Sequence, residues 1–419
     1  MPFFDFSDYV LEHSEKAMEK AGKAFDVIEE TGAYNQQKVL KAFIDNAVTE
    51  ADFSVTTGYG YGDRGREKLD RIYADVFGAQ SALVRHSFTC GTHTLTVMLF
   101  GLLRPGDTML CVTGTPYDTI HGVIGINGEK KGSLADFGVK YAQVNLDKNG
   151  RPDIEAIEKA LEMKPKMVYI QRSRGYSLRP SLSVREIGEI ADLVHSKCDA
   201  IVAVDNCYGE FTEKSEPTQA GADIMAGSLI KNPGGGIART GGYIAGREDL
   251  VELCSFRATA PGLGKEVGCT LGENRNMYMG IFSSPNVVTQ ALKTAVFSAA
   301  LFENFGFKAT PSCNEPRHDI IQALCLETPE RLCEFCKGIQ AGSPVDSFVT
   351  PEPWDMPGYD SKVIMAAGAF ISGASIELSA DAPLREPYAV WMQGGITFET
   401  GKTAVMLAAE NLFKAGLLK

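Results

Sequence analysis

The sequence predicts an α/β fold built on a mostly parallel β-sheet. Short apolar runs alternate with amphipathic helical segments from about residue 65 onward. Strands separated by helices of about ten to fifteen residues imply right-handed crossovers, which join parallel strands. One run, AIVAVDN, is almost wholly apolar, as expected for a strand buried on both faces. With 419 residues, of which 44% are hydrophobic, the chain is long enough for two domains.

The elements follow one another in a regular order. The first fifty residues predict amphipathic helix, in SEKAMEKAGKAFDVIEE and QQKVLKAFIDNAV. Further helices are predicted in REKLDRIYADVFG, THTLTVMLFGLL and IEAIEKALEM, and strands in SALVRHS, DTMLCVTG, YAQVNL, KMVYIQR and AIVAVDN. The composition shifts near Ser283, where FSSPNVVTQALKTAVFSAALFENFG predicts a long helix. Extended pieces, FISGASIELSAD and YAVWMQGGITFE, then precede a closing helix, TGKTAVMLAAENLFKAG.

This order divides the chain into three parts. We expect an N-terminal helical segment over residues 1–50 and a large α/β domain over residues 51–283. A smaller α+β domain is expected over residues 284–419.

Charge and composition exclude several classes of partner. Forty-one basic residues against fifty-three acidic ones give a formal net charge of −12, which argues against a nucleic-acid or anionic-membrane surface. The N-terminus lacks the apolar stretch of a secretory signal, and no apolar run approaches the roughly 20 residues that span a bilayer. Ten scattered cysteines without an export signal fit reduced thiols. We therefore expect a cytoplasmic protein without membrane or nucleic-acid partners.

One pair of cysteines, Cys333 and Cys336, has the C-x-x-C spacing of a redox or zinc half-site. Thr328 and Pro329 before it are typical of a helix start, and the cysteines continue an apolar stripe with helical spacing. No second pair with zinc spacing follows. The pattern favours core packing, and the sequence predicts no metal site.

The end of the apolar run AIVAVDN places a carboxylate, Asp205, where open parallel sheets bind their ligands. A buried carboxylate is costly unless it is paired or hydrogen-bonded. Three interpretations are open: Asp205 caps the following turn, meets a cationic ring, or binds a metal for which only Glu210 is near in sequence.

The segment GYGDRG has the spacing of a dinucleotide fingerprint, but it lacks a good preceding strand and the expected acid, which disfavours a nicotinamide enzyme.

A second candidate lies in RHSFTCGTHTL, where small and hydroxyl residues directly precede a helix. Backbone N–H groups at a helix N-terminus, together with the hydroxyls of Thr89 and Thr92, form an anion site suited to phosphate. An ordinary helix cap explains the same residues. We assign His93 no catalytic role.

The third candidate is Lys231 in GSLIKNPGGG, at the end of an apolar run and before three consecutive glycines. Alone it fits a loop lysine as well as an amine held for covalent chemistry. Ser228 offers a hydroxyl for a phosphate, and the glycines let the backbone approach a ligand closely. Lysine, Asp205 and a phosphate-binding helix terminus are the parts required by a carbonyl cofactor with a phosphate and a protonatable ring, which is pyridoxal 5′-phosphate.

Four segments carry a closer resemblance: IQRSRGYS, VDNCYGEF, GSLIKNPGGGIARTGGYIAG and REPYAVWMQGGITFE. They resemble the cystathionine/methionine lyase superfamily of fold-type I pyridoxal-phosphate enzymes, over roughly residues 50–419. In detail they are similar to a bacterial methionine γ-lyase-like or cystathionine β-lyase-like branch associated by name with aluminium resistance. The resemblance implies a mostly parallel seven-stranded sheet sandwiched by helices. It also implies pyridoxal 5′-phosphate and a homodimer or homotetramer with shared active sites.

The resemblance also implies roles for individual residues. Lys231 becomes the lysine that bonds to the cofactor, Asp205 the partner of the pyridine nitrogen, and Tyr117 the aromatic residue that stacks on the ring. Cys207 takes the place of the family's threonine under the ring. The phosphate ligands implied are Ser228, Cys90, Gly91 and Thr92. Lys231, Asp205 and Tyr117 are thus the predicted catalytic residues.

Two parts of the family pattern are not matched in register. Tyr59, Tyr61 and Arg64 are our candidates for the residues that reach the phosphate of a neighbouring subunit. The arginine that holds the substrate carboxylate is absent in its usual form. Arg385 in LREPY is our replacement, because a guanidinium matches a carboxylate in bidentate fashion, and Arg172 and Arg174 are second choices.

The reaction implied is a carbon–sulfur lyase acting on an amino acid of the cystathionine, cysteine or methionine type. Removal of the α-proton and β- or γ-elimination end in a 2-oxo acid, ammonia and a thiol. The lysine–aspartate pair is equally compatible with aldol cleavage, racemisation or transamination. A cofactor-binding stress protein with little catalysis is a further alternative.

Overall fold

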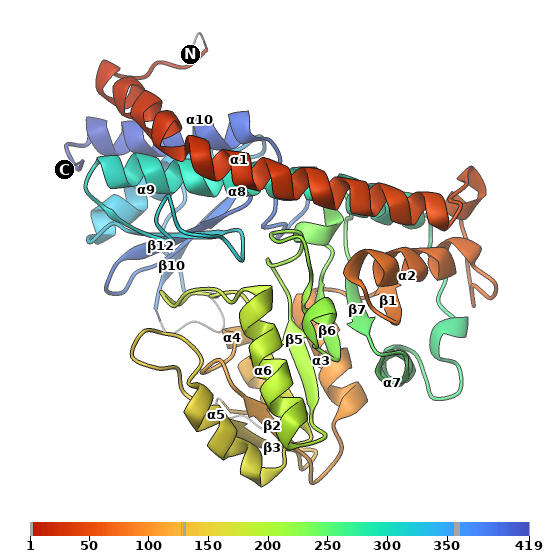
Figure 1. Ribbon diagram of the computed structural model, residues 1–419. Coiled ribbons are helices and arrows are strands. Elements are labelled where there is room, and N and C mark those ends of the chain that lie inside the picture. The colour runs from red at the N-terminus through yellow and green to blue at the C-terminus, as the bar shows by residue number, and fades with distance from the viewer. Residues whose placement is uncertain (1–2, 127, 129–130, 356–360, 419) are drawn as a thin grey trace. The chain divides into compact units, whose positions relative to one another are not determined.

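The computed structural model describes residues 3–126, 128, 131–355 and 361–418 (Figure 1). The chain forms two compact units. The large unit is Tyr34–Ser284, and the C-terminal unit combines Met1–Ala33 with Pro285–Lys419. Two helices, α1 (Asp8–Asp45) and α8 (Asn274–Asn304), contribute residues to both units. Within the described ranges, no helix combines the length and apolar character needed to cross a membrane.

A seven-stranded sheet forms the centre of the large unit, in the order β1-β7-β6-β5-β4-β2-β3. Its strands are β1 (Ser81–Arg85), β2 (Thr108–Cys111), β3 (Lys140–Gln143), β4 (Met167–Gln171), β5 (Ile201–Asp205), β6 (Ile224–Ser228) and β7 (Gly242–Gly246). Five neighbouring strands run parallel to one another: β3, β2, β4, β5 and β6. Strand β7 runs antiparallel to both of its neighbours, β6 and β1. Every residue of β4 to β7 is buried, so both faces of the sheet are covered.

Helices cover this sheet (Figure 1). They are α2 (Arg64–Phe77), α3 (Gly91–Leu102), α4 (Asp118–Ile124), α5 (Ile154–Ala160), α6 (Val184–Lys197) and α7 (Glu248–Ala258). Helix α3 packs against α7 and β6, and α6 packs against α5. The apolar core beneath α3 joins Met98 and Leu99 to Met109, Tyr169 and Ala203 of the sheet. This burial supplies the main favourable free energy of the unit.

Local signals set the ends of these helices. Helix α2 begins after Asp63, whose side chain accepts a hydrogen bond from the Arg66 N–H, and ends at Gly78 in the left-handed conformation. Ser183 and Glu186 form a reciprocal capping box at the start of α6. Such caps satisfy N–H groups that have no partner within the helix.

The C-terminal unit has a five-stranded antiparallel sheet in the order β10-β11-β12-β9-β8. Its strands are β8 (Lys308–Thr310), β9 (Ile321–Cys325), β10 (Val363–Ala367), β11 (Ser379–Pro383) and β12 (Ala389–Gln393). Helices α9 (Pro329–Ala341) and α10 (Phe398–Lys414) pack against each other. Thr328 caps α9, where Cys336 is buried in the core and Cys333 is partly exposed. All ten cysteines are free thiols.

The predicted α/β architecture, with a seven-stranded sheet and a smaller α+β unit, is confirmed. Two element predictions were wrong. Helix α8 begins at Asn274, not near Ser283, because the helical spacing of buried Met277 and Ile281 continues through Pro285. The segment FISGASIELSAD is mostly turns before Ser379, because the Glu377 carboxylate accepts hydrogen bonds from the N–H groups of Phe370 and Ile371.

Candidate active site

The carboxyl ends of three neighbouring parallel strands bring the candidate residues together. Strand β5 ends at Asp205, which lies beside Gln171 at the end of β4. Strand β6, on the other side of β5, ends at Ser228, and Lys231 follows three residues later. Ligands of open parallel sheets bind at this edge. Residues that are distant in sequence therefore share one location.

Lys231 is partly exposed, and its Nζ lies 4.0 Å from the centroid of the Tyr208 ring. Burial by itself would lower the pKa of this amine. The acidic groups around it outweigh burial and raise the pKa; they belong to Cys207, Tyr208, Asp205 and Glu210. Lys231 is thus held as an ammonium in a pocket lined by acids and one aromatic face.

Asp205, the last residue of β5, is buried at the same edge of the sheet. Its Oδ1 accepts a hydrogen bond from the Cys207 N–H at 3.1 Å, and the Tyr169 hydroxyl donates to its Oδ2 over 3.5 Å. Burial raises the pKa of Asp205 against the opposing effect of the Lys231 charge. Asp205 therefore caps the turn with one oxygen and leaves the other weakly bound. In the ranges that the structure describes, no three potential ligands gather around a metal position.

The CGT turn, Cys90–Thr92, begins helix α3 beside these residues. Cys90 caps the helix, with its Sγ accepting from the His93 N–H at 3.4 Å, and the Thr92 hydroxyl bonds to Thr119. A Cβ added at Gly91 would lie 3.3 Å from Ser228 Cβ and 3.6 Å from Cys207 Sγ. The helix N-terminus, Ser228 and Cys207 thus meet at one point.

Ser228 is the clearest candidate for a ligand-binding hydroxyl group. Its side chain is fully buried, and its Oγ has no hydrogen-bond partner among the described residues. Buried hydroxyl groups are normally hydrogen-bonded, because an unpartnered one is costly. Ser228 Oγ beside the first residue of α3 is therefore suited to an anionic oxygen.

Tyr117 lies at the start of α4, with its ring 5.7 Å from that of Tyr176. A Cβ at Gly175 would come within 3.2 Å of the Tyr117 ring and 3.3 Å of Gln171 Nε2. Tyr117 is thereby placed beside the loop that follows β4. Its predicted stacking on a ligand ring remains a prediction.

The three candidate arginines differ in surroundings. Arg172 is fully buried, and its five N–H groups donate to Leu182, Asn206, Thr212, Glu213 and Glu216. None of these donors remains for a substrate carboxylate, so Arg172 braces the loops behind the site instead. Arg174 is buried two residues further along the same loop. Arg385 is exposed in the C-terminal unit, after β11.

Tyr59 and Tyr61 lie on the glycine-rich loop before α2, 72% and 62% exposed, with their rings stacked at 5.4 Å. Arg64 Nε donates to Asp52 Oδ1 at 2.8 Å. The buried Arg66 holds this loop in place. Its Nη1 donates to the carbonyl oxygen of Gly60 in the loop and to that of Gly268. Two large exposed aromatic side chains on a firmly held loop are suited to contact with another molecule.

Two residues of the site were not assigned a role from the sequence. Tyr208, which lies against Lys231, was passed over, and Glu210 was considered only as a metal ligand. Tyr208 and Phe211 both have φ values in the left-handed region, 71° and 63°. This conformation is uncommon for large side chains and is typical of loops held for function. The signal that could have identified Tyr208 and Glu210 in the sequence was their position in the short segment that follows Asp205.

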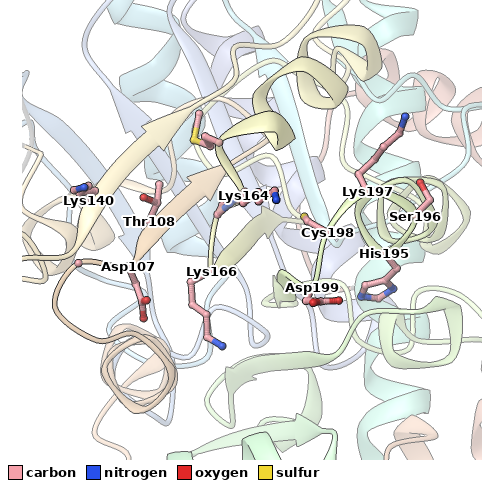
Figure 2. Close-up of a pocket in the computed structure, with 13 residues that line it drawn as sticks. Asp107, Thr108, Lys140, Lys164, Lys166, His195, Ser196, Lys197, Cys198 and Asp199 are labelled. Atoms are coloured by element: carbon pink, nitrogen blue, oxygen red, sulfur yellow. The ribbon is translucent and has the colours of Figure 1, made fainter.

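A separate hollow of about 830 Å³ lies at the opposite edge of the sheet, before the first residues of β2 to β5. Figure 2 shows Lys140, Lys164, Lys166 and Lys197 around it, with their amines pointing apart. Lys197 is paired with Glu158. Because these side chains do not converge, we do not assign this hollow to the active site.

The fold and this edge define a pyridoxal-phosphate enzyme of fold type I. The fold is shared with the pyridoxal-5′-phosphate-dependent protein YhfS from Escherichia coli, at a TM-score of 0.63 and 16% identity over 92% of this chain and 97% of that one. The model of the methionine gamma-lyase family matches residues 10–413, and the chain belongs to this family. Its members are carbon–sulfur lyases related to the cystathionine and methionine lyases, with pyridoxal 5′-phosphate as cofactor.

Closer relatives cover nearly the whole chain. YnbB of Bacillus subtilis, an uncharacterised protein, is 48% identical over 393 residues, which are 93% of each chain. A solved structure from Clostridium novyi, named a carbon-sulfur lyase involved in aluminum resistance, has a TM-score of 0.94 and 50% identity. The match covers 97% of this chain and 96% of that one.

The residues of this edge fit the cofactor. The unpartnered Ser228 Oγ and the close approach at Gly91 suit its phosphate, and Asp205 offers a carboxylate to a protonated ring nitrogen. Lys231 offers the amine that its carbonyl group requires.

Proposed function

We propose that this protein is a pyridoxal-phosphate-dependent lyase that cleaves the carbon–sulfur bond of a cystathionine-, cysteine- or methionine-type amino acid. The products are a 2-oxo acid, ammonia and a thiol, formed by β- or γ-elimination. One observation carries the proposal: Lys231 and Asp205 share an edge with Ser228 Oγ, a buried hydroxyl without a hydrogen-bond partner in the described ranges. We place the protein in the cytoplasm, which suits its ten free thiols.

The cofactor, when bound, supplies an electron sink for the electron pair left at Cα after its proton is removed. Its phosphate would be held by Ser228 and the CGT turn, its ring nitrogen by Asp205 and its ring faces by Cys207 and Tyr117. The Asp205 carboxylate would hold a proton at the ring nitrogen. Because Asp205 is buried, water does not compete for that proton.

Lys231 would move the substrate proton. Its amine accepts the proton from Cα, and the surrounding acids favour the resulting ammonium. The same ammonium can then donate its proton to the departing sulfur. Lys231 thus serves as base and acid in turn at one position.

Other groups would orient the substrate. Arg385 or Arg174 would bind its α-carboxylate through paired N–H groups. Tyr59, Tyr61 and Arg64 would complete the phosphate site of a neighbouring subunit, which requires a homodimer or a homotetramer.

Lys231→Ala tests the covalent role of the lysine. We expect the visible absorbance of the lysine-bound cofactor to be lost and the activity to fall by at least about 10³-fold, as expected for loss of a residue central to catalysis. The control is Lys265→Ala, at a lysine of the same unit whose Nζ donates to Ser81 Oγ in β1. A Lys231→Ala protein that stays yellow and active would contradict the proposal.

The substrate is tested with cystathionine, cysteine and methionine, by measuring 2-oxo acid and thiol together. Pyruvate indicates β-elimination from cysteine, and 2-oxobutanoate indicates γ-elimination from methionine. Racemised amino acid without thiol release would exclude a lyase. Unchanged spectra with every amino acid tested would favour a binding protein.

A further inference from the structure

A buried carboxyl group behind Lys231 has no role in the mechanism above. Glu210 has 0% exposure. Its Oε1 accepts a hydrogen bond from the Tyr243 hydroxyl at 2.8 Å, whereas its Oε2 has no partner among the described residues. A buried carboxyl oxygen without a partner is costly, so the chain keeps Glu210 at the expense of stability. Such groups gather at functional sites.

The backbone makes room for this side chain beside the lysine. A Cβ at Gly227 would overlap both Glu210 Oε1 and the Tyr243 ring, so only glycine fits there. Gly227 directly precedes Ser228 and pairs with Tyr243 across β6 and β7. The carboxyl group therefore lies against the strand that leads into Lys231.

The loop that carries Glu210 is tied to the turn that carries Lys231. The Asn232 side chain donates to the Glu210 carbonyl oxygen at 2.9 Å. Two residues before Glu210, the left-handed Tyr208 presents its ring to Lys231 Nζ. Lys231 is thus enclosed by Tyr208 and backed by two buried acids, Asp205 and Glu210.

Only one of these acids is needed as a permanent partner for the cofactor ring, and that is Asp205 in the proposed function. We propose that Glu210 is a positioning residue for Lys231: it compensates the charge of the lysine nitrogen and adjusts the proton affinity of that nitrogen. This inference rests on the proposed role of Lys231.

The electrostatic surroundings agree with an exchangeable charge. Burial raises the pKa of Glu210 to about 8, against the opposing effects of its hydrogen bonds and of Lys231. The titratable groups that face Glu210 are Tyr243 on β7, Tyr73 on α2, Glu216 before the turn Pro217–Ala220, and Cys207 and Lys231 on the adjoining loops. The Glu210 carboxyl group therefore exchanges its proton at a much higher pH than an exposed glutamate does, and its charge then faces the Lys231 nitrogen.

Glu210→Gln tests this role in the cofactor-loaded full chain. Glutamine keeps an acceptor for Tyr243 but cannot ionise. The readout is the pH at which the absorbance of the lysine-bound cofactor changes, which reports the proton on the Lys231 nitrogen. We expect this midpoint to fall by about 0.5–1 pH unit, because a nearby negative charge that favours the protonated form is lost. Tyr243→Phe removes the hydrogen bond from the Tyr243 hydroxyl to Glu210 Oε1 and should also shift the absorbance midpoint.

The matched control is Glu410→Gln. Glu410 is equally a buried glutamate, but it accepts hydrogen bonds from Ser7 within the C-terminal unit. Its replacement should leave the absorbance midpoint unchanged.

Unfolding midpoints against pH give a second readout. The folded protein retains the Glu210 proton up to about pH 8, whereas the unfolded chain loses it near 4.5. Glu210 thus makes stability fall as pH rises through this window, and Glu210→Gln should remove that part of the fall. An unchanged absorbance curve in Glu210→Gln would overturn the inference. Failure of wild type to form the lysine-bound cofactor would instead overturn the proposed function.

Discussion

At the scale of residues, Ser228 carries the proposed binding of an anion at this site. Ser228 is a hydroxyl donor that has no hydrogen-bond partner among the residues that the structure describes, at the point where α3 begins. A ligand oxygen at this position would restore the hydrogen bond and offset the cost of burying the hydroxyl group.

Ser228→Ala should therefore separate stability from cofactor binding. We expect cofactor affinity to fall roughly tenfold or more, because a hydrogen bond to a charged group contributes about 1.5–3 kcal/mol. The stability of the cofactor-free protein should hold or rise slightly, since no hydrogen bond is lost. Cofactor titration and thermal unfolding measure the two effects.

Ser298→Ala is the control, because Ser298 Oγ is another buried hydroxyl that lacks a partner within the described part of the chain. It lies in the part of α8 that belongs to the C-terminal unit. It should leave cofactor affinity unchanged. Equal retention of the cofactor by both variants would contradict the role of Ser228.

Much of the site could be predicted from local sequence, and part could not. Lys231, Asp205 and the CGT turn each follow an apolar run or begin a helix, so their shared location follows from the parallel-sheet pattern. Glu210 depends on the antiparallel pairing of β6 with β7, which brings Tyr243 and Gly227 to it. Local patterns do not contain such pairing. Arg172 was considered a substrate ligand for a similar reason, since its five partners come from distant segments.

At the scale of elements, the α/β alternation was sufficient to predict the sheet but not every boundary. Helix α8 passes through Pro285, which the sequence pattern placed at a helix start. Tertiary packing of its first two turns outweighed that signal. In the proposed function α3 has a direct part, because its first residue, Gly91, borders Ser228.

Gly91→Ala tests the position of α3. Alanine favours helix, but its Cβ would lie 3.3 Å from Ser228 Cβ and enter the proposed phosphate space. We expect cofactor affinity to fall by about tenfold or more, because small displacements at such sites are costly. The thermal stability of the cofactor-free protein should change little.

Gly122→Ala in α4 provides the comparison, since a Cβ there has open space. If Gly91→Ala binds the cofactor as tightly as Gly122→Ala does, the phosphate does not lie at the start of α3.

At the scale of the whole molecule, exposed Tyr59 and Tyr61 predict an active site shared between subunits. Mixing inactive Lys231→Ala with inactive Tyr59→Phe/Tyr61→Phe should restore activity, because a hybrid dimer contains one site with both parts intact. Random pairing gives about a quarter of the wild-type activity for a symmetric dimer. The assay is 2-oxo acid release after the two proteins have been unfolded and refolded together.

Each variant refolded alone serves as the control and should stay inactive. Mixtures that remain inactive, although hybrids form, would place both tyrosines in the site of their own chain. A double tyrosine variant that is active when refolded alone would place them outside any site.

The attachment of the Tyr59–Tyr61 loop has a consequence for how this protein diversifies. Arg66 grips the loop by main-chain oxygens, which every amino acid possesses. Gly60 must stay glycine, because a Cβ there would lie 2.7 Å from the Cys269 backbone. The two tyrosines beside it are under no such demand. Substitutions at Tyr59 and Tyr61 can therefore change the side chains on this loop during evolution without changing the backbone path of the loop.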